Sequence, residues 1–385
     1  MTSWSTPAVR ILAAVLAAVS LGVFATGAWE SLATQIDYDL KQRWLEYQYF
    51  RQGSYPNPWI DAPPPGMPRT LSVYLPYAFP MMAALFEPGG LAQARLALVI
   101  LSAVSLVTIG ACGWRILSAG GRAWAWVGGF ACSAIFVNRS AINLGQFSIV
   151  CVALVMLQIV LLQRNRPLLA GTCWALAMIK PHVAVAFGAL FLLNRQWRGL
   201  AWGAGILAML SLAALWWTDV SLHSLVTYWL GRETMTFSSE AIGFGPGRIA
   251  EWTGLPHRAV QYAMIAGLAL VTAAAAVAMR GMRIADLLVP AAICAVLGRL
   301  CFYHRPNDQI MLSPLLFACL ATALQRRTAP SVAIASAVAL TLWLPLRLQL
   351  AVPGAAAVQP AIWVAGAAYL AAARLRPSRD GTVPR

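Results

Sequence analysis

Long apolar runs alternate along the chain with short gaps that carry basic side chains. A helix needs roughly 20 apolar residues to cross a lipid bilayer, and fewer when it packs inside a bundle. Runs that meet this requirement occur at about 11–29, 91–112, 123–139, 146–163, 199–217, 258–279, 285–302, 309–325, 329–347 and 357–373. Arginines stand in many of the gaps, as they do in the cytoplasmic loops of membrane proteins. The pattern therefore predicts an all-α, polytopic membrane protein.

The interval between Arg166 and Arg195 departs from this pattern. If both arginines face the cytoplasm, the chain must cross the membrane an even number of times between them. The interval is short for two full spans, and Lys180 at its centre is a costly charge in lipid that precedes the helix breaker Pro181. We predict two short helices that meet at a Lys-Pro turn on the outer face. The chain is then a single integral membrane domain over 1–385 with about 12 transmembrane helices and both termini inside.

Composition agrees with a chain that is surrounded by lipid. Of its 385 residues, 60% are hydrophobic and only 11% are charged, whereas a soluble domain carries roughly 25% charged residues. The formal net charge of +15 does not indicate nucleic-acid binding, because the basic residues form no continuous face. The first apolar run is followed by no good cleavage site, so we interpret it as an uncleaved first span and not as a removed signal.

Familiar signatures of metal and cofactor chemistry are missing. The seven cysteines lie in or at the ends of apolar runs and include no CxxC pair, which predicts neither a zinc site nor a disulfide framework. The sequence also contains no Walker A loop, no HExxH cluster and no GxSxG nucleophile elbow. We therefore predict no metal and no cofactor.

The predicted topology places most polar chemistry on the outer face. Of the 13 carboxylates, only Asp286 and Asp380 fall on the cytoplasmic side. Two long outer loops result, at about 30–90 and 218–257, and we expect them to carry amphipathic helices. The first loop opens with the densest cluster of charges in the chain, Asp37 to Gly53.

Apolar residues recur at helical spacing from Leu40 onward, which predicts an amphipathic helix lying on the membrane surface and ending at Gly53. Asp37 and Asp39 stand at its start. Two roles remain open for them, because a carboxylate at this position either caps the helix or is presented for catalysis.

Three further positions are candidates for chemistry. Lys180 in an apolar setting needs a partner, which is either a lipid phosphate or an outer carboxylate. His304 and Arg305 stand in a turn between two spans, where they either meet a phosphate and relay a proton or belong to a solvated loop. Gln146 opens a span and either binds substrate or forms a hydrogen bond between helices.

Short motifs in a fixed order give the chain a resemblance to a known group of enzymes. They are Asp39-Leu with Gly53-Ser-Tyr55, the Tyr74 to Pro80 segment, Leu144-Gly-Gln146, Ala170-Gly171 through Lys180-Pro181, Arg195-Gln-Trp-Arg198, and Tyr303-His304 to Asp308. In these motifs the chain resembles polytopic membrane glycosyltransferases of the GT-C type. It is specifically similar to glycosyltransferase family 87, the polyprenyl-phosphate-mannose-dependent mannosyltransferase-like group.

The resemblance implies transfer of a sugar, mannose first of all, from a polyprenyl-phosphate-linked donor to a hydroxyl of a lipid or glycan acceptor. The reaction inverts the anomeric centre and takes place on the outer, periplasmic face of a bacterial cytoplasmic membrane. The implied residues are Asp39 or Asp37 as general base, Lys180, Arg305 and His304 for the donor phosphate, and Tyr55, Tyr74, Tyr77, Gln146, Trp229 and Asp308 for the substrate. A competing interpretation, which also explains Lys180 and a broken helix, is a transporter or flippase of a lipid-linked or anionic solute.

Overall fold

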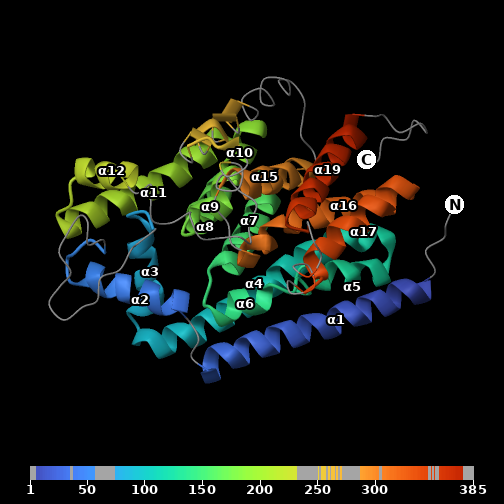
Figure 1. The fold of residues 1–385 in the computed structure, drawn as a ribbon, viewed down its shortest axis with the longest axis horizontal. Coiled ribbons are helices and arrows are strands. Elements are labelled where there is room, and N and C mark those ends of the chain that lie inside the picture. The colour runs from blue at the N-terminus through green and yellow to red at the C-terminus, as the bar shows by residue number, and fades with distance from the viewer. Residues whose placement is uncertain are drawn as a thin grey trace.

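The computed structural model describes residues 6–34, 38–56, 74–231, 287–302, 306–345, 348, 351 and 355–375, together with scattered positions between 250 and 270. Within these residues the fold is helical and contains no strand. Figure 1 shows the long first helix along one side of the bundle, with the N-terminus at one end and α2 and α3 at the other.

The helices have the following bounds. They are α1 (Thr6–Trp29), η1 (Glu30–Thr34), α2 (Tyr38–Arg51), α3 (Ala78–Phe86), α4 (Gly90–Leu117), η2 (Ser118–Gly120), α5 (Arg122–Ala131), α6 (Asn138–Asn143), α7 (Ser148–Gln163), α8 (Pro167–Ala177), α9 (Pro181–Ala184), η3 (Val185–Gly188), α10 (Ala189–Leu193), α11 (Trp197–Thr218), α12 (Leu222–Gly231), α15 (Leu288–Cys301), η4 (Pro306–Leu312), α16 (Ser313–Arg326), α17 (Ala329–Trp343) and α19 (Ala355–Leu375).

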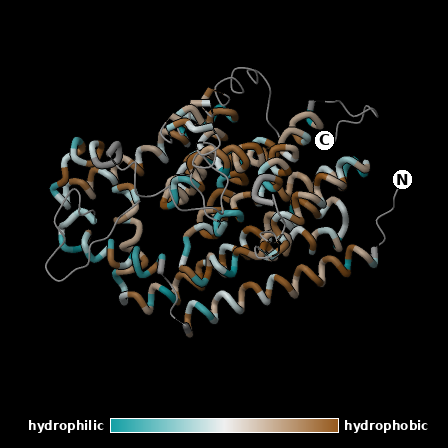
Figure 2. The backbone as a smooth tube through the Cα atoms, viewed as in Figure 1, coloured by the Kyte–Doolittle hydropathy of each residue, from teal (hydrophilic) through white to brown (hydrophobic). Residues whose placement is uncertain are grey.

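Several of these helices are apolar enough to cross a membrane. In the described part of the chain, four are also long enough: Pro7–Ala33, Gly90–Gly120, Trp197–Thr218 and Pro306–Arg326. Shorter apolar helices, such as Ser148–Gln163 and Leu288–Cys301, accompany them. Figure 2 shows hydrophobic residues along the whole of α1. The chain is thus a multi-pass, all-helical membrane protein, as predicted, while the total of about 12 spans stays a prediction. Most of the run at 258–279 lies outside the described residues.

The predicted span over 123–139 is wrong as a single helix. Helix α5 ends at Ala131, and a new helix, α6, begins only at Asn138. The carboxamide of Asn138 explains the break, because its Nδ2 donates a hydrogen bond to the carbonyl of Cys132 at 2.9 Å. The same carbonyl also accepts the backbone N–H of Ile135 at 3.2 Å, so a backbone turn and the side chain of Asn138 together stabilise the break.

The two short helices predicted between Arg166 and Arg195 are confirmed. Helix α8 ends at Ala177 and α9 begins at Pro181, so the chain turns at Lys180. The indole of Trp174 in α8 donates a hydrogen bond to the carbonyl of Ala184 at 3.1 Å, which ties the two arms together. This turn brings Lys180 to the same end of the bundle as the start of α7.

The amphipathic helix predicted in the first loop is also confirmed. Helix α2 ends at Arg51, and Gly53 follows in the left-handed conformation with φ +77°. Its apolar side packs on α3, where Tyr47 stacks on Phe86 and Phe50 on Phe79, each with 5.6 Å between ring centroids. Tyr47 also donates a hydrogen bond to Glu87 at 2.5 Å, which fixes α2 against the end of α3.

Candidate active site

The start of α2 is held against the turn that precedes α7. The backbone N–H of Leu40 donates to the carbonyl of Leu144 at 3.2 Å. Gly145 follows with φ +70°, and a Cβ on it would lie 2.5 Å from the Cβ of Leu40. Only glycine both adopts this backbone conformation without strain and leaves room for Leu40. The Leu144-Gly-Gln146 motif is therefore the docking point that places Asp39, in the first turn of α2, beside Gln146.

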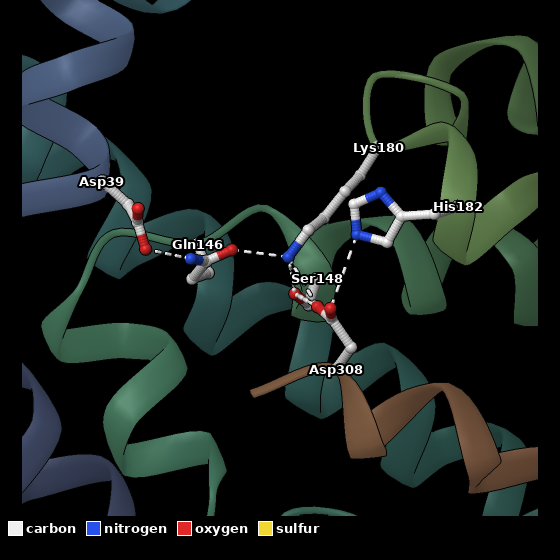
Figure 3. A network of polar contacts seen from close by, with 6 residues as sticks. All are labelled: Asp39, Gln146, Ser148, Lys180, His182 and Asp308. Atoms are coloured by element: carbon white, nitrogen blue, oxygen red, sulfur yellow. Dashed lines mark hydrogen bonds and ion pairs between the residues drawn. The ribbon is translucent and has the colours of Figure 1, made fainter. Parts of the chain in front are cut away.

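Polar side chains from four segments form one connected chain at this docking point (Figure 3). The amide nitrogen of Gln146 donates to Asp39, and its oxygen accepts from the Nζ of Lys180 at 2.5 Å. The same Nζ lies 2.6 Å from the hydroxyl of Ser148 and 2.5 Å from the Oδ1 of Asp308. We call these five residues, Asp39, Gln146, Ser148, Lys180 and Asp308, the polar relay.

Asp308 is the anionic end of the polar relay. It accepts a hydrogen bond from Ser148 at 2.6 Å, and its Oδ2 lies 3.4 Å from the Nε2 of His182. The side chains of Lys180 and Asp308 are only 6% and 2% exposed, so the pair is enclosed by protein. Of the two partners that the sequence leaves open for Lys180, the structure shows the carboxylate.

Lys180 has no hydrogen left for a further acceptor. An ammonium group carries three N–H donors, and Gln146, Ser148 and Asp308 use all three. A lipid phosphate would bind Lys180 only by displacing one of these buried acceptors. The geometry therefore assigns Lys180 first of all to holding neighbouring side chains in place.

The carboxylates near this docking point differ in their partners. Glu46 is fully buried and lies 2.6 Å from the guanidinium of Arg43, and Asp308 is paired with Lys180. Asp39 is partly exposed and is bonded to the neutral amide of Gln146, with no cationic partner among the residues that the structure describes. Of these three carboxylates, Asp39 is thus the one that is both accessible and not ion-paired.

Tyr74 borders this group through Arg43, whose guanidinium lies 4.6 Å from the centre of the tyrosine ring. Tyr55 and Tyr77 are different, because they are only 2% and 5% exposed and belong to the protein core. Tyr55 packs edge-on against Phe79 with 5.6 Å between ring centroids. Burial raises the pKa of Tyr74 and of Tyr77, so both phenols keep their proton.

The structure thus brings together four of the site residues predicted from the sequence: Asp39, Gln146, Lys180 and Asp308. Asp37, His304 and Arg305 lie outside the described residues, as does the side chain of Trp229. Sequence reasoning missed Ser148 and His182. Each stands two residues after a predicted one, Gln146 and Lys180, and that spacing was the available signal. In the described part of the chain, no three His, Cys, Asp or Glu side chains gather as metal ligands would.

Comparison with known proteins gives one finding. The family model for glycosyltransferase family 87 matches residues 79–303, which is more than half of the chain. Gln146, Ser148, Lys180 and His182 lie inside this stretch, whereas Asp39 precedes it and Asp308 follows it. No curated protein and no solved structure matches the chain.

Proposed function

We propose a specific reaction for this chain, which belongs to glycosyltransferase family 87 and is therefore a glycosyltransferase. In this proposal it transfers a sugar, mannose first of all, from a polyprenyl-phosphate-linked donor to a hydroxyl of a lipid or glycan acceptor. The observation that carries the proposal is the state of Asp39. A general base must be reachable by the acceptor and must not be neutralised by a cation, and of the described carboxylates Asp39, Glu46 and Asp308 only Asp39 meets both conditions.

The proposed step inverts the anomeric centre. Asp39 takes the proton of the acceptor hydroxyl while the acceptor oxygen forms a bond to the anomeric carbon of the donor sugar. The bond between that carbon and the phosphate oxygen breaks, and the polyprenyl phosphate leaves with the electron pair. Because the attack comes from the side opposite the phosphate, the configuration inverts. The proton resides on Asp39 at the end of the step.

The polar relay supports this role by fixing the orientation of Gln146. Lys180 is a donor only, so it must face the amide oxygen of Gln146, and the amide nitrogen must then point at Asp39. Asp308 and Ser148 in turn hold the Nζ of Lys180. We therefore propose Lys180 and Asp308 as positioning residues that keep one oxygen of Asp39 bonded and leave the other for the acceptor. In this proposal Lys180 positions Gln146 and does not contact the donor phosphate, which is the contact that the sequence had led us to expect.

The distribution of charge along the helices supports an active site on the outer face. Helix α7 begins at Ser148 in the polar relay and ends beside Arg164, and α8 begins beside Arg166 and returns the chain to Lys180. The Arg195 turn meets the same arginine end, where Gln196 donates a hydrogen bond to the carbonyl of Leu162 at 3.0 Å. Arginine-rich ends face the cytoplasm in most membrane proteins. The polar relay then faces outward.

The test is transfer from radiolabelled polyprenyl-phosphate-mannose in membranes that contain the wild type, Asp39→Asn, Asp37→Asn or Glu87→Gln. We expect Asp39→Asn to lower the transfer rate by about 10²- to 10⁴-fold, because the proton of the acceptor has no destination. Glu87→Gln is the matched control, since Glu87 is a carboxylate of the first loop that is 53% exposed and pairs with Arg51, and a glutamine oxygen can still accept the hydrogen bond from Tyr47. It should keep the wild-type rate.

Two results would contradict the proposal. A normal rate in Asp39→Asn, with loss of transfer in Asp37→Asn, would move the base two residues back. A wild type that transfers no sugar from any polyprenyl-phosphate donor, while labelled lipid crosses the bilayer, would replace the proposed reaction altogether. Insertion of every variant is checked by its yield in the membrane fraction.

A further inference from the structure

Four cationic side chains are buried in the described part of the chain: Arg43, Arg95, Lys180 and Arg299. Arg43 and Lys180 each meet a carboxylate, and Arg95 also has an interaction partner. Arg299 is the most buried of the four, with 3% of its surface exposed. Its Nε and Nη1 have no hydrogen-bond acceptor among the residues that the structure describes. Arg299 is therefore a buried cation with no ion-pair partner in the described part of the chain.

Arg299 lies at the end of the bundle that holds the polar relay. It is in the last turn of α15, and the neighbouring Gly298 packs against Ala186 in η3 and Met311 in η4. Figure 1 shows α15 between α9 and α19. The guanidinium lies 5.6 Å from the ring centre of Trp363 in α19 and within electrostatic range of Asp308 and His182.

The charges at this end do not balance. Asp308 pairs with Lys180 at 2.5 Å and also attracts Arg299, so in the described part of the chain this one carboxylate faces two buried cations. The sequence from 299 to 328 contains no second carboxylate. The contact with Trp363 attracts a cation only weakly and leaves Nε and Nη1 of the guanidinium without acceptors among the described residues. A buried, unmatched guanidinium is destabilising unless a ligand supplies the missing acceptors.

We propose that Arg299 binds a phosphate group, namely the phosphate that links the sugar to the lipid in the donor. This inference rests on the proposed function and adds to it the residue that holds the leaving group. A guanidinium presents two parallel N–H donors, which match two oxygens of a phosphate. Negative charge grows on the phosphate as the sugar leaves, so a fixed cation there stabilises the transition state. Arg299 lies within electrostatic range of Asp308, and Asp39 is connected to Lys180 through Gln146.

The experiment measures thermal unfolding of the purified full-length protein in nanodiscs of phosphatidylcholine. Wild type, Arg299→Met and Arg299→Lys are each measured alone, with polyprenyl phosphate, with polyprenol, with inorganic phosphate and with added phosphatidylglycerol. We expect polyprenyl phosphate, and none of the other additions, to raise the midpoint of the wild type. Arg299→Met should lose this rise. Arg299→Lys, which keeps the charge without the paired donors, should keep part of it.

The ligand-free midpoints give a second, independent readout. Arg299→Met removes an unmatched charge, so its midpoint should equal or exceed that of the wild type. Arg43→Met is the contrasting variant, because it removes the cation that faces the fully buried Glu46 and should lower the midpoint. In transfer assays, Arg299→Met should raise the KM for the donor by about 10- to 100-fold. The KM for the acceptor should change little.

Each outcome separates this inference from the proposed function. Equal ligand-induced shifts in wild type and Arg299→Met, or an unchanged KM for the donor, would overturn the phosphate site and leave the transferase intact. A shift produced by inorganic phosphate or phosphatidylglycerol, and lost in Arg299→Met, would overturn the lipid donor as its ligand. A wild type that transfers no sugar, but shows the Arg299-dependent shift with polyprenyl phosphate, would keep the site and overturn the proposed reaction.

Discussion

Replacing Lys180 by methionine tests the polar relay directly. The substitution keeps most of the length of the side chain, removes its charge, and deletes hydrogen bonds of 2.5–2.6 Å to Gln146, Ser148 and Asp308. It leaves the carboxylate of Asp308, which is 2% exposed, without its ammonium partner. Removing one member of a buried ion pair typically costs about 3–5 kcal/mol. We expect Lys180→Met to lower the free energy of unfolding by about that amount.

The double variant Lys180→Met/Asp308→Asn separates stability from catalysis. It removes both charges, and replacement of a buried pair by neutral groups is often close to neutral in stability, so it should unfold within about 1 kcal/mol of the wild type. Because Asp308→Asn alone should also cost about 3–5 kcal/mol, the coupling energy between the two positions is then at least about 5 kcal/mol. Activity should not recover in the same way. Gln146 still lacks the donor that orients it, and we expect kcat to stay lower by about 100-fold in both variants.

The assay is a double-mutant cycle of unfolding free energies in detergent micelles, together with kcat for sugar transfer by each variant. Additive losses, in which the double variant is as unstable as the sum of the single ones, would show that Lys180 and Asp308 are not coupled. Recovery of kcat in the double variant would show that Lys180 does not act through Gln146. Either result would refute the positioning role.

Two glycine substitutions test the close contacts of the fold. Gly145→Ala places a side chain at φ +70° against Leu40, so it should lower the free energy of unfolding by about 1–2 kcal/mol. It should also lower kcat for sugar transfer, because α2 is displaced. Both quantities are measured as for the Lys180 variants. Gly113→Ala would bring a Cβ to 2.3 Å from the carbonyl oxygen of Gly128, so it should lower the free energy of unfolding by about 1–3 kcal/mol and lower the midpoint of thermal unfolding. Gly22→Ala is the control, because Gly22 has open space around it and its midpoint should change little. Equal midpoints for the last two variants would refute the tight packing of α4 on α5.

The sequence was most informative where a residue conflicted with its surroundings. A lysine followed by proline in an apolar interval predicted both the turn after α8 and a charged partner for Lys180. The partner itself could not be identified, because Asp308 is 128 residues away and no local periodicity relates the two. The only signal for Ser148 was its place two residues after Gln146, since a serine at the start of a helix is ordinary. Long-range contacts of this kind are decided by packing and not by local pattern.

The error at 123–139 has the same origin. Apolar residues continue through the end of α5, so hydropathy alone does not distinguish one span from a helix, a turn and a second short helix. The break depends on the carboxamide of Asn138 reaching back to the carbonyl of Cys132. The sequence does show a polar side chain, Asn138, inside an apolar run. That side chain indicates a helix break only when the carbonyl to which it donates is known.

The sequence had left a transporter open as the alternative, and membership of glycosyltransferase family 87 sets that alternative aside. The contacts of Lys180 also fit an enzyme better than a transporter. A transported anion would need a cation that exchanges partners during the cycle. Lys180 instead donates all three of its ammonium hydrogens to side chains of the protein, namely Gln146, Ser148 and Asp308. Among Asp39, Glu46 and Asp308, the carboxylate without a described cationic partner is Asp39, on the helix α2 that follows the first span. In the proposed reaction, a cation that does not move keeps Gln146, and through it the general base Asp39, in one orientation. Catalysis requires such a fixed geometry, and transport does not.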